Sequence, residues 1–186
     1  MARLIYSGIT SLDGYTADEA GNFDWSAPDA EVHAHVNDAE RAIGTYLYGR
    51  RMYDVMKVWQ TFGTDDGEDP VVRDYGVLWR AADKIVYSRS LREATTDRTR
   101  IESVFDPDAV RALVEEADAD LSIGGPELGA LALAVGLVDE IHQYVNPVIV
   151  GGGTRFLPRG LSVSLELLHE HRFGNGVVHL GYRVRR

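Results

Sequence analysis

The sequence has 186 residues, of which 45% are hydrophobic and 26% are charged, and these totals predict one soluble domain spanning residues 1–186. A net charge of −10 argues against a nucleic-acid-binding protein, which would normally present a basic face. The chain has no cysteine, which excludes disulfides and thiolate zinc sites, and its apolar runs are too short to cross a membrane, so we expect a cytoplasmic protein.

The first part of the chain predicts a strand, a turn and a helix. Residues 3–10 are β-branched and aromatic, which favours a strand, and Asp13 lies in the turn that follows. Residues 15–23 are polar and predict an irregular loop. A helix begins near Pro28, has Asp29 in its first turn and extends to about residue 43. Asp13 and Asp29 are candidate catalytic carboxylates, although a turn-shaping role for Asp13 and a helix-opening role for Asp29 fit the same residues.

A second strand, residues 45–48, leads directly into Gly49-Arg50-Arg51-Met52-Tyr53-Asp54, which opens a helix to about residue 59. Two arginines at a helix N-terminus oppose the helix dipole by about 0.3–1 kcal/mol each near a surface. We therefore expect solvent, an acid or an anionic ligand to compensate them. A glycine- and acid-rich loop follows at residues 61–69, and residues 71–80 predict another helix.

The third strand, residues 83–88, ends in Ser88-Arg89-Ser90. Two hydroxyls and a guanidinium at the carboxyl end of a strand suit a phosphate monoester, because the fork of arginine matches phosphate oxygens. The same tripeptide also occurs in ordinary turns. Residues 99–105 predict a strand, and Asp106 is the expected N-cap of a helix over residues 108–117.

The segment Leu121–Ile123 predicts a buried strand that ends at Gly124-Gly125. Pro126, Glu127 and Leu128 then open a helix that extends to residue 135. Such a turn presents backbone N–H groups to an anion, and glycines let a ligand lie against the backbone, although a tight turn alone explains them too. The segment matches neither the Walker loop nor the dinucleotide fingerprint.

Residues 138–150 predict a long strand in which Pro147 indicates an edge or a bulge. Residues 163–173 and 177–184 flank Gly174-Asn175-Gly176 and predict a β-hairpin. The alternation of strands and helices therefore predicts an α/β fold with a mixed, mostly parallel central sheet and a C-terminal β-hairpin. In such a sheet the residues that follow the strands gather at one edge, where ligands bind.

We expect no metal site. His33 and His35 are two residues apart on a predicted helix, so their side chains point to different sides.

Several of these motifs resemble the dihydrofolate reductase family. Gly49–Asp54 is similar to its Gly-Arg-x-Thr/Met-aromatic-acid helix opening, Ile123–Gly125 resembles its second cofactor turn, and Ser88–Ser90 stands where the family reads the adenosine 2′-phosphate. The most similar branch is the reductase domain of bifunctional riboflavin-biosynthesis proteins and its stand-alone relatives, through Ser11–Tyr15 and Pro147–Gly153. The resemblance covers nearly the whole chain and implies a three-layer fold.

The resemblance further implies NADPH binding and hydride transfer to a small heterocyclic or carbonyl/imine substrate, either a riboflavin precursor or a pterin-like compound. The implied cofactor contacts are Gly49, Arg50, Arg51, Met52, Ser88, Arg89, Ser90, Gly124, Gly125, Pro126, Glu127 and Leu128. Trp25 and Tyr53 are the implied substrate contacts. Dihydrofolate reductases place a carboxylate after a Trp…Pro segment with Pro-x-acid spacing, whereas Asp29 follows Pro28 directly.

Two alternatives remain open: a non-catalytic nucleotide-binding or sensing protein on the same fold, and an assembly module without a small ligand. Relatives form dimers through strands like those near Pro147 and in the final hairpin, so a homodimer is also expected. The zinc deaminase half of the bifunctional proteins is not expected, because its site needs a Cys-x-x-Cys motif.

Overall fold

The computed structural model describes residues 1–185. The strands are β1 Leu4–Ser11, β2 Tyr15–Ala17, β3 Ile43–Gly49, β4 Asp83–Tyr87, β5 Thr99–Glu102, β6 Asp120–Gly124, β7 Glu140–Asn146, β8 Thr154–Arg155, β9 Leu165–Arg172 and β10 Val178–Val184. The helices are α1 Ala30–Glu40, α2 Arg50–Met56, α3 Pro70–Ala81, α4 Pro107–Glu116 and α5 Pro126–Ala134, with short 3-10 helices η1 Asp24–Ser26 and η2 Lys57–Gln60.

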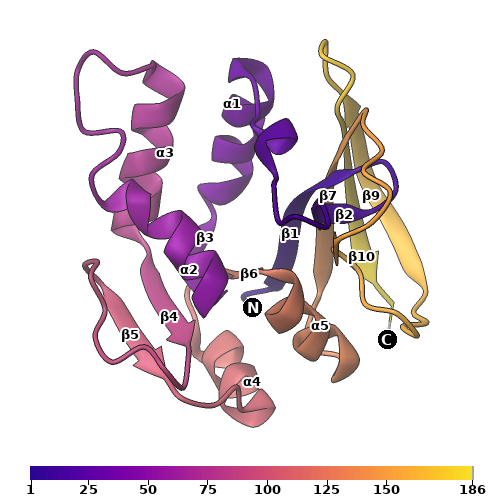
Figure 1. The fold of residues 1–186 in the computed structure, drawn as a ribbon. Coiled ribbons are helices and arrows are strands. Elements are labelled where there is room, and N and C mark those ends of the chain that lie inside the picture. Colours follow the sequence, from indigo (N-terminus) through magenta and orange to yellow (C-terminus); the bar gives the residue numbers. More distant parts are fainter. Residues whose placement is uncertain (186) are drawn as a thin grey trace.

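One eight-stranded sheet in the order β5-β4-β3-β6-β1-β7-β10-β9 forms the centre of the molecule. The strands from β5 to β7 pair in parallel, and β10 and β9 continue the sheet as an antiparallel hairpin. Helices lie on both sides of this sheet (Figure 1). The mixed, mostly parallel sheet with a C-terminal hairpin is therefore confirmed. No helix in the described residues combines the length and apolar character of a membrane-crossing segment.

Two predicted boundaries near the N-terminus are wrong. The first long helix ends at Glu40 rather than at residue 43, because Ile43 already belongs to β3. Residues 15–23 are not wholly irregular, since Tyr15–Ala17 pairs with Thr154–Arg155 in a small second sheet.

The predicted strand at residues 138–150 is shorter than expected. Strand β7 ends at Asn146, so Pro147, which has no N–H to donate, lies outside the ladder. An edge position near Pro147 is also wrong, because β7 pairs with β1 on one side and β10 on the other. The edge at this end of the sheet is β9.

Side chains alternate between the two faces of the sheet, and each face has its own core. On β3, Leu47 joins a cluster with residues of α4 and α5, whereas Tyr46 and Tyr48 face α3. The indole N–H of buried Trp79 on α3 donates to the Tyr48 hydroxyl at 3.2 Å. Helices on both faces therefore fix the position of β3, and with it the residues that follow this strand.

Gly129 sets the distance between α5 and β1. The Tyr6 ring stacks on Phe156 with centroids 4.3 Å apart, and the Tyr6 hydroxyl donates to the Phe156 carbonyl at 2.8 Å. A Cβ at Gly129 would lie 2.4 Å from Tyr6 Cε2, closer than any real contact. The close approach therefore requires glycine, and it positions the start of α5.

We predict that Gly129→Ala lowers the free energy of unfolding by about 1–3 kcal/mol, as overpacking does, although alanine normally favours a helix. Urea denaturation measures the change. In a Tyr6→Leu background, which removes the ring, the same substitution should be less destabilising. An equal loss in both backgrounds would contradict the proposed clash.

Candidate functional site

Three neighbouring parallel strands end at the same edge of the sheet, and the candidate cofactor residues follow these ends. Gly124 on β6 lies opposite Tyr48 on β3, and Gly49 lies opposite Tyr87 on β4. Ser88 is the next residue after Tyr87. The structure thus brings the two glycine turns and the serine turn together, as expected for the ligand-binding edge of an α/β sheet.

The turn at Gly124-Gly125 leads into the N-terminus of α5. Gly125 has a φ of 96°, a conformation that favours glycine, and no side chain caps the helix. A Cβ at Gly124 would lie 3.0 Å from the Tyr48 ring, and one at Gly125 would lie 3.3 Å from Met52 Cβ. The glycines therefore let α5 begin beside α2, with its N-terminal N–H groups available for an anion.

The two arginines of α2 connect this helix to both neighbouring turns. Arg50 Nη1 donates to Ser90 Oγ at 2.8 Å, and Arg51 Nη1 donates to Glu127 Oε1 at 3.1 Å. Arg50 Nε also contacts Asp54 at 3.5 Å, and the pKa of Asp54 is lowered by Lys57 first and by Arg50 as well. Acids and a hydroxyl therefore compensate the arginines, although such exposed pairs contribute only about 0–1 kcal/mol each.

The serine turn leaves one cation without a partner. Ser88 Oγ accepts hydrogen bonds from the backbone N–H groups of Ser90 at 3.3 Å and Leu91 at 3.0 Å, so Ser88 shapes its own turn. Arg89 is exposed and forms no hydrogen bond or ion pair with any residue in 1–185. Arg89 is therefore the guanidinium in this turn that is available to an external anion.

Tyr53 has a structural role that the sequence did not reveal. Its side chain is buried, and its hydroxyl contacts Thr95 Oγ1 at 3.3 Å and Thr96 Oγ1 at 3.0 Å. Burial alone would raise the pKa of Tyr53, but these hydrogen bonds outweigh it and the pKa is lowered. These contacts hold the segment after the serine turn against α2, which is a different role from the expected substrate contact.

Asp29 is the N-cap of α1. Its carboxylate is exposed and accepts a hydrogen bond from the Val32 N–H at 3.0 Å, which is the helix-opening role that the sequence left open. Trp25 lies nearby in η1, which contacts β1. The Trp25 indole nitrogen is shielded from solvent and has no hydrogen-bond partner within the described part of the chain. An unpaired buried donor is unfavourable unless a ligand accepts from it.

Asp13 connects the segment after β1 to the segment after β7. Its two oxygens accept from the N–H groups of Val150 at 3.2 Å and Gly151 at 2.8 Å. The Ser11 hydroxyl first, and these backbone donors next, lower the pKa of Asp13. A carboxylate with a lowered pKa is a poor proton donor near neutral pH. The observed contacts match the turn-shaping role rather than the catalytic one.

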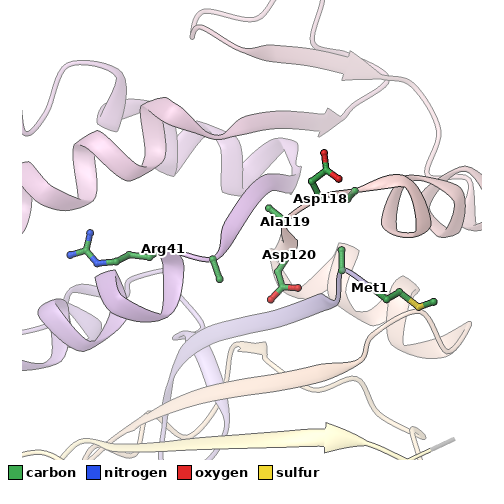
Figure 2. A pocket seen from close by; sticks show the side chains of 8 residues that line it. Met1, Arg41, Asp118, Ala119 and Asp120 are labelled. Carbon is green, nitrogen blue, oxygen red and sulfur yellow. The ribbon is translucent and has the colours of Figure 1, made fainter.

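An open hollow of about 530 Å³ lies at the opposite, amino-terminal edge of the sheet (Figure 2). Arg41 extends away from this hollow in Figure 2 and pairs with Asp74 at 2.7 Å, and Asp120 pairs with Arg3. The hollow contains none of the predicted site residues, so we assign the candidate site to the carboxyl edge.

Comparisons with known proteins agree with this fold. A model of the RibD C-terminal domain family matches residues 2–179. The uncharacterized protein YyaP of Bacillus subtilis is 26% identical over 182 residues, which cover 97% of this chain and 94% of YyaP. A Shewanella sp. PV-4 protein, whose name provisionally assigns it to riboflavin biosynthesis, has a TM-score of 0.77 at 21% identity over 99% of both chains.

Dihydrofolate reductase from Enterococcus faecalis, solved with NADP(H), has a TM-score of 0.63 at 13% identity over 99% of this chain and 97% of that chain. At such low identities the solved structures establish the fold, which is that of dihydrofolate reductase.

We predict that Asp13→Asn accelerates hydrogen exchange of the Val150 and Gly151 amides, because one carboxylate oxygen becomes an NH2 group that only donates, so the side chain can no longer accept from both N–H groups. Since the pKa of Asp13 is lowered from 3.8, its stabilising contribution is present above that value and is lost as the pH falls through the folded-state pKa. Hydrogen-exchange mass spectrometry measures the change. Asp118→Asn, the same substitution at an exposed position on the opposite edge, is the control and should leave both amides protected.

Proposed function

Because the chain belongs to the RibD C-terminal domain family, we propose that it is an NADPH-dependent reductase that transfers a hydride to a small heterocyclic or carbonyl/imine substrate. Gly49, Ser88 and Gly124 carry this proposal, because they lie at the carboxyl ends of three adjacent strands and combine open backbone with nearby cations. The favoured substrates are riboflavin precursors and pterin-like compounds, whose carbonyl and imine groups accept a hydride.

The residues at the edge fit a dinucleotide phosphate. No atom lies within 4 Å of a Cβ built on Gly49, so the space beside this backbone is free for a ligand. The uncapped N-terminus of α5 supplies N–H donors for a pyrophosphate, with Arg51 paired to Glu127 in the first turn of this helix and Arg50 on the side of the serine turn. Arg89, which has no partner in residues 1–185, suits the additional 2′-phosphate. When bound, NADPH would supply the hydride.

The chain must also supply or direct a proton. We place Trp25, in η1, beside the substrate, and Asp29 begins α1 a few residues further along the chain. We assign the proton transfer to Asp29, directly or through water, because its carboxylate is exposed and its single cap contact leaves the other oxygen free.

One observation favours a second function, that of a nucleotide sensor without catalysis. Both candidate carboxylates already have structural roles, Asp29 as a helix cap and Asp13 as a connection between two loops. A sensor would use the same anion-binding edge but would not oxidise NADPH with any substrate. Turnover therefore separates the two functions, whereas cofactor affinity does not.

We predict that the protein binds NADPH more tightly than NADH and that Arg89→Ala removes most of this preference. A charge-assisted hydrogen bond contributes about 1.5–3 kcal/mol, which is about 10- to 150-fold in affinity. Fluorescence titration with both cofactors, using the tryptophans as donors, measures the preference. Arg172→Ala, at the far end of the sheet on β9, is the charge-matched control. Equal affinities in the unmodified protein would contradict the assignment of Arg89.

We predict that Asp29→Asn lowers kcat by about 100-fold or more while NADPH binding and thermal stability remain nearly unchanged. Asparagine caps a helix as well as aspartate does, so the substitution removes the acid and preserves the cap. NADPH oxidation is followed across pterins, flavin precursors and small carbonyl compounds. Unchanged turnover would remove Asp29 from the mechanism, and no turnover of any compound by the unmodified protein would favour the sensor.

A further inference from the structure

Histidines from three different strands meet on one face of the sheet. Gly181 on β10 lies between His142 on β7 and His169 on β9, opposite both in the two strand registers. His179, two residues before Gly181, projects from the same face as its neighbours because side chains alternate along a strand. The pairing of the three strands therefore brings together His142, His169 and His179, which are far apart in sequence.

The nitrogen atoms of these histidines have the spacing of a metal site. One ring nitrogen from each of the three lies within 4.8 Å of the others. His179 Nε2 is 3.3 Å from His142 Nδ1, and two ligands of a tetrahedral zinc at 2.0–2.1 Å are about 3.4 Å apart. A Cβ at Gly181 would lie 2.3 Å from His169 Nε2, so glycine provides the space in which the His169 ring lies.

The Glu140 carboxylate contacts the His142 ring at the nitrogen that faces away from the other histidines. His142 Nε2 contacts Glu140 Oε2 at 3.3 Å, and Arg3 Nη1 holds the other Glu140 oxygen at 3.0 Å. The Glu140 side chain is only 5% exposed. A metal-binding histidine usually donates a hydrogen bond from its second ring N–H to such a carboxylate. This hydrogen bond orients the ring and leaves the other nitrogen free for the metal.

The His179 ring is fixed and incompletely paired. It is 1% exposed and stacks on Tyr144 with centroids 4.3 Å apart. Its Nδ1 is buried without a hydrogen-bond partner among residues 1–185, and Nε2 meets only another imidazole.

We propose that His142, His169 and His179 bind one divalent transition-metal ion, with Zn²⁺ as the best-fitting probe. Imidazole ligands suit zinc, and three of them leave a fourth coordination position for water or a small anion. His169 belongs to the edge strand β9, which pairs only with β10. The ion would therefore connect the edge strand directly to β7, a connection that does not depend on the proposed reductase activity.

Isothermal titration of the chelator-treated full chain with Zn²⁺ tests the proposal. We expect one equivalent to bind with a dissociation constant of about 1 µM or lower. His169→Asn, at an exposed position, should fold normally by circular dichroism and weaken binding at least about 10-fold. His33→Asn on α1, whose ring packs against Trp59 and Tyr75, is the control and should bind unchanged.

Two further readouts separate a built site from adventitious binding by surface histidines. Zn²⁺ should slow hydrogen exchange in β9, and Co²⁺ should give the visible spectrum of a four-coordinate ion. Glu140→Gln should weaken Zn²⁺ binding by about 10- to 100-fold, because it replaces the carboxylate that contacts His142 Nε2 and orients this ring. Absence of saturable binding, or equal affinities of the unmodified protein and His169→Asn, would overturn the proposal.

Discussion

The candidate site depends on the parallel register of β4, β3 and β6. A shift of one residue would exchange the two faces of a strand, and β3 cannot tolerate this because Leu47 is buried on one side and Tyr46 and Tyr48 on the other. Gly124 is therefore held opposite Tyr48, the residue before Gly49, at the ends of neighbouring strands. Packing in both cores, rather than any contact within the site, determines where the glycine backbones lie.

This arrangement explains how an acidic chain can present an anion-binding edge. The net charge is −10, yet Arg50, Arg51 and Arg89 all follow strand ends at this edge. The exposed pair of Arg51 and Glu127 is weak enough for a phosphate to replace it, since such pairs contribute only about 0–1 kcal/mol. Local positive charge at a helix N-terminus thus outweighs the distant acids, which solvent screens.

Features with local signals could be predicted from the sequence, and features created by pairing could not. The N-cap at Asp106 and the hairpin around Gly174–Gly176 have strong local signals, and the structure has both. Strands β2 and β8 are too short for any periodicity to reveal. The sequence predicted no metal site because it was judged from His33 and His35 alone, whereas His142, His169 and His179 come from three strands that meet around Gly181.

Helix α1 links the two proposed sites. It begins at the Asp29 cap, and His35, about 9 Å further along the helix axis, contacts the Tyr144 hydroxyl at 3.1 Å. The His35 ring also lies 4.8 Å from that of His179. Helix α1 therefore both carries the candidate proton donor and contacts the ring of one proposed metal ligand. The anion-binding edge on β4, β3 and β6 lies on the other side of β1 and does not share these contacts.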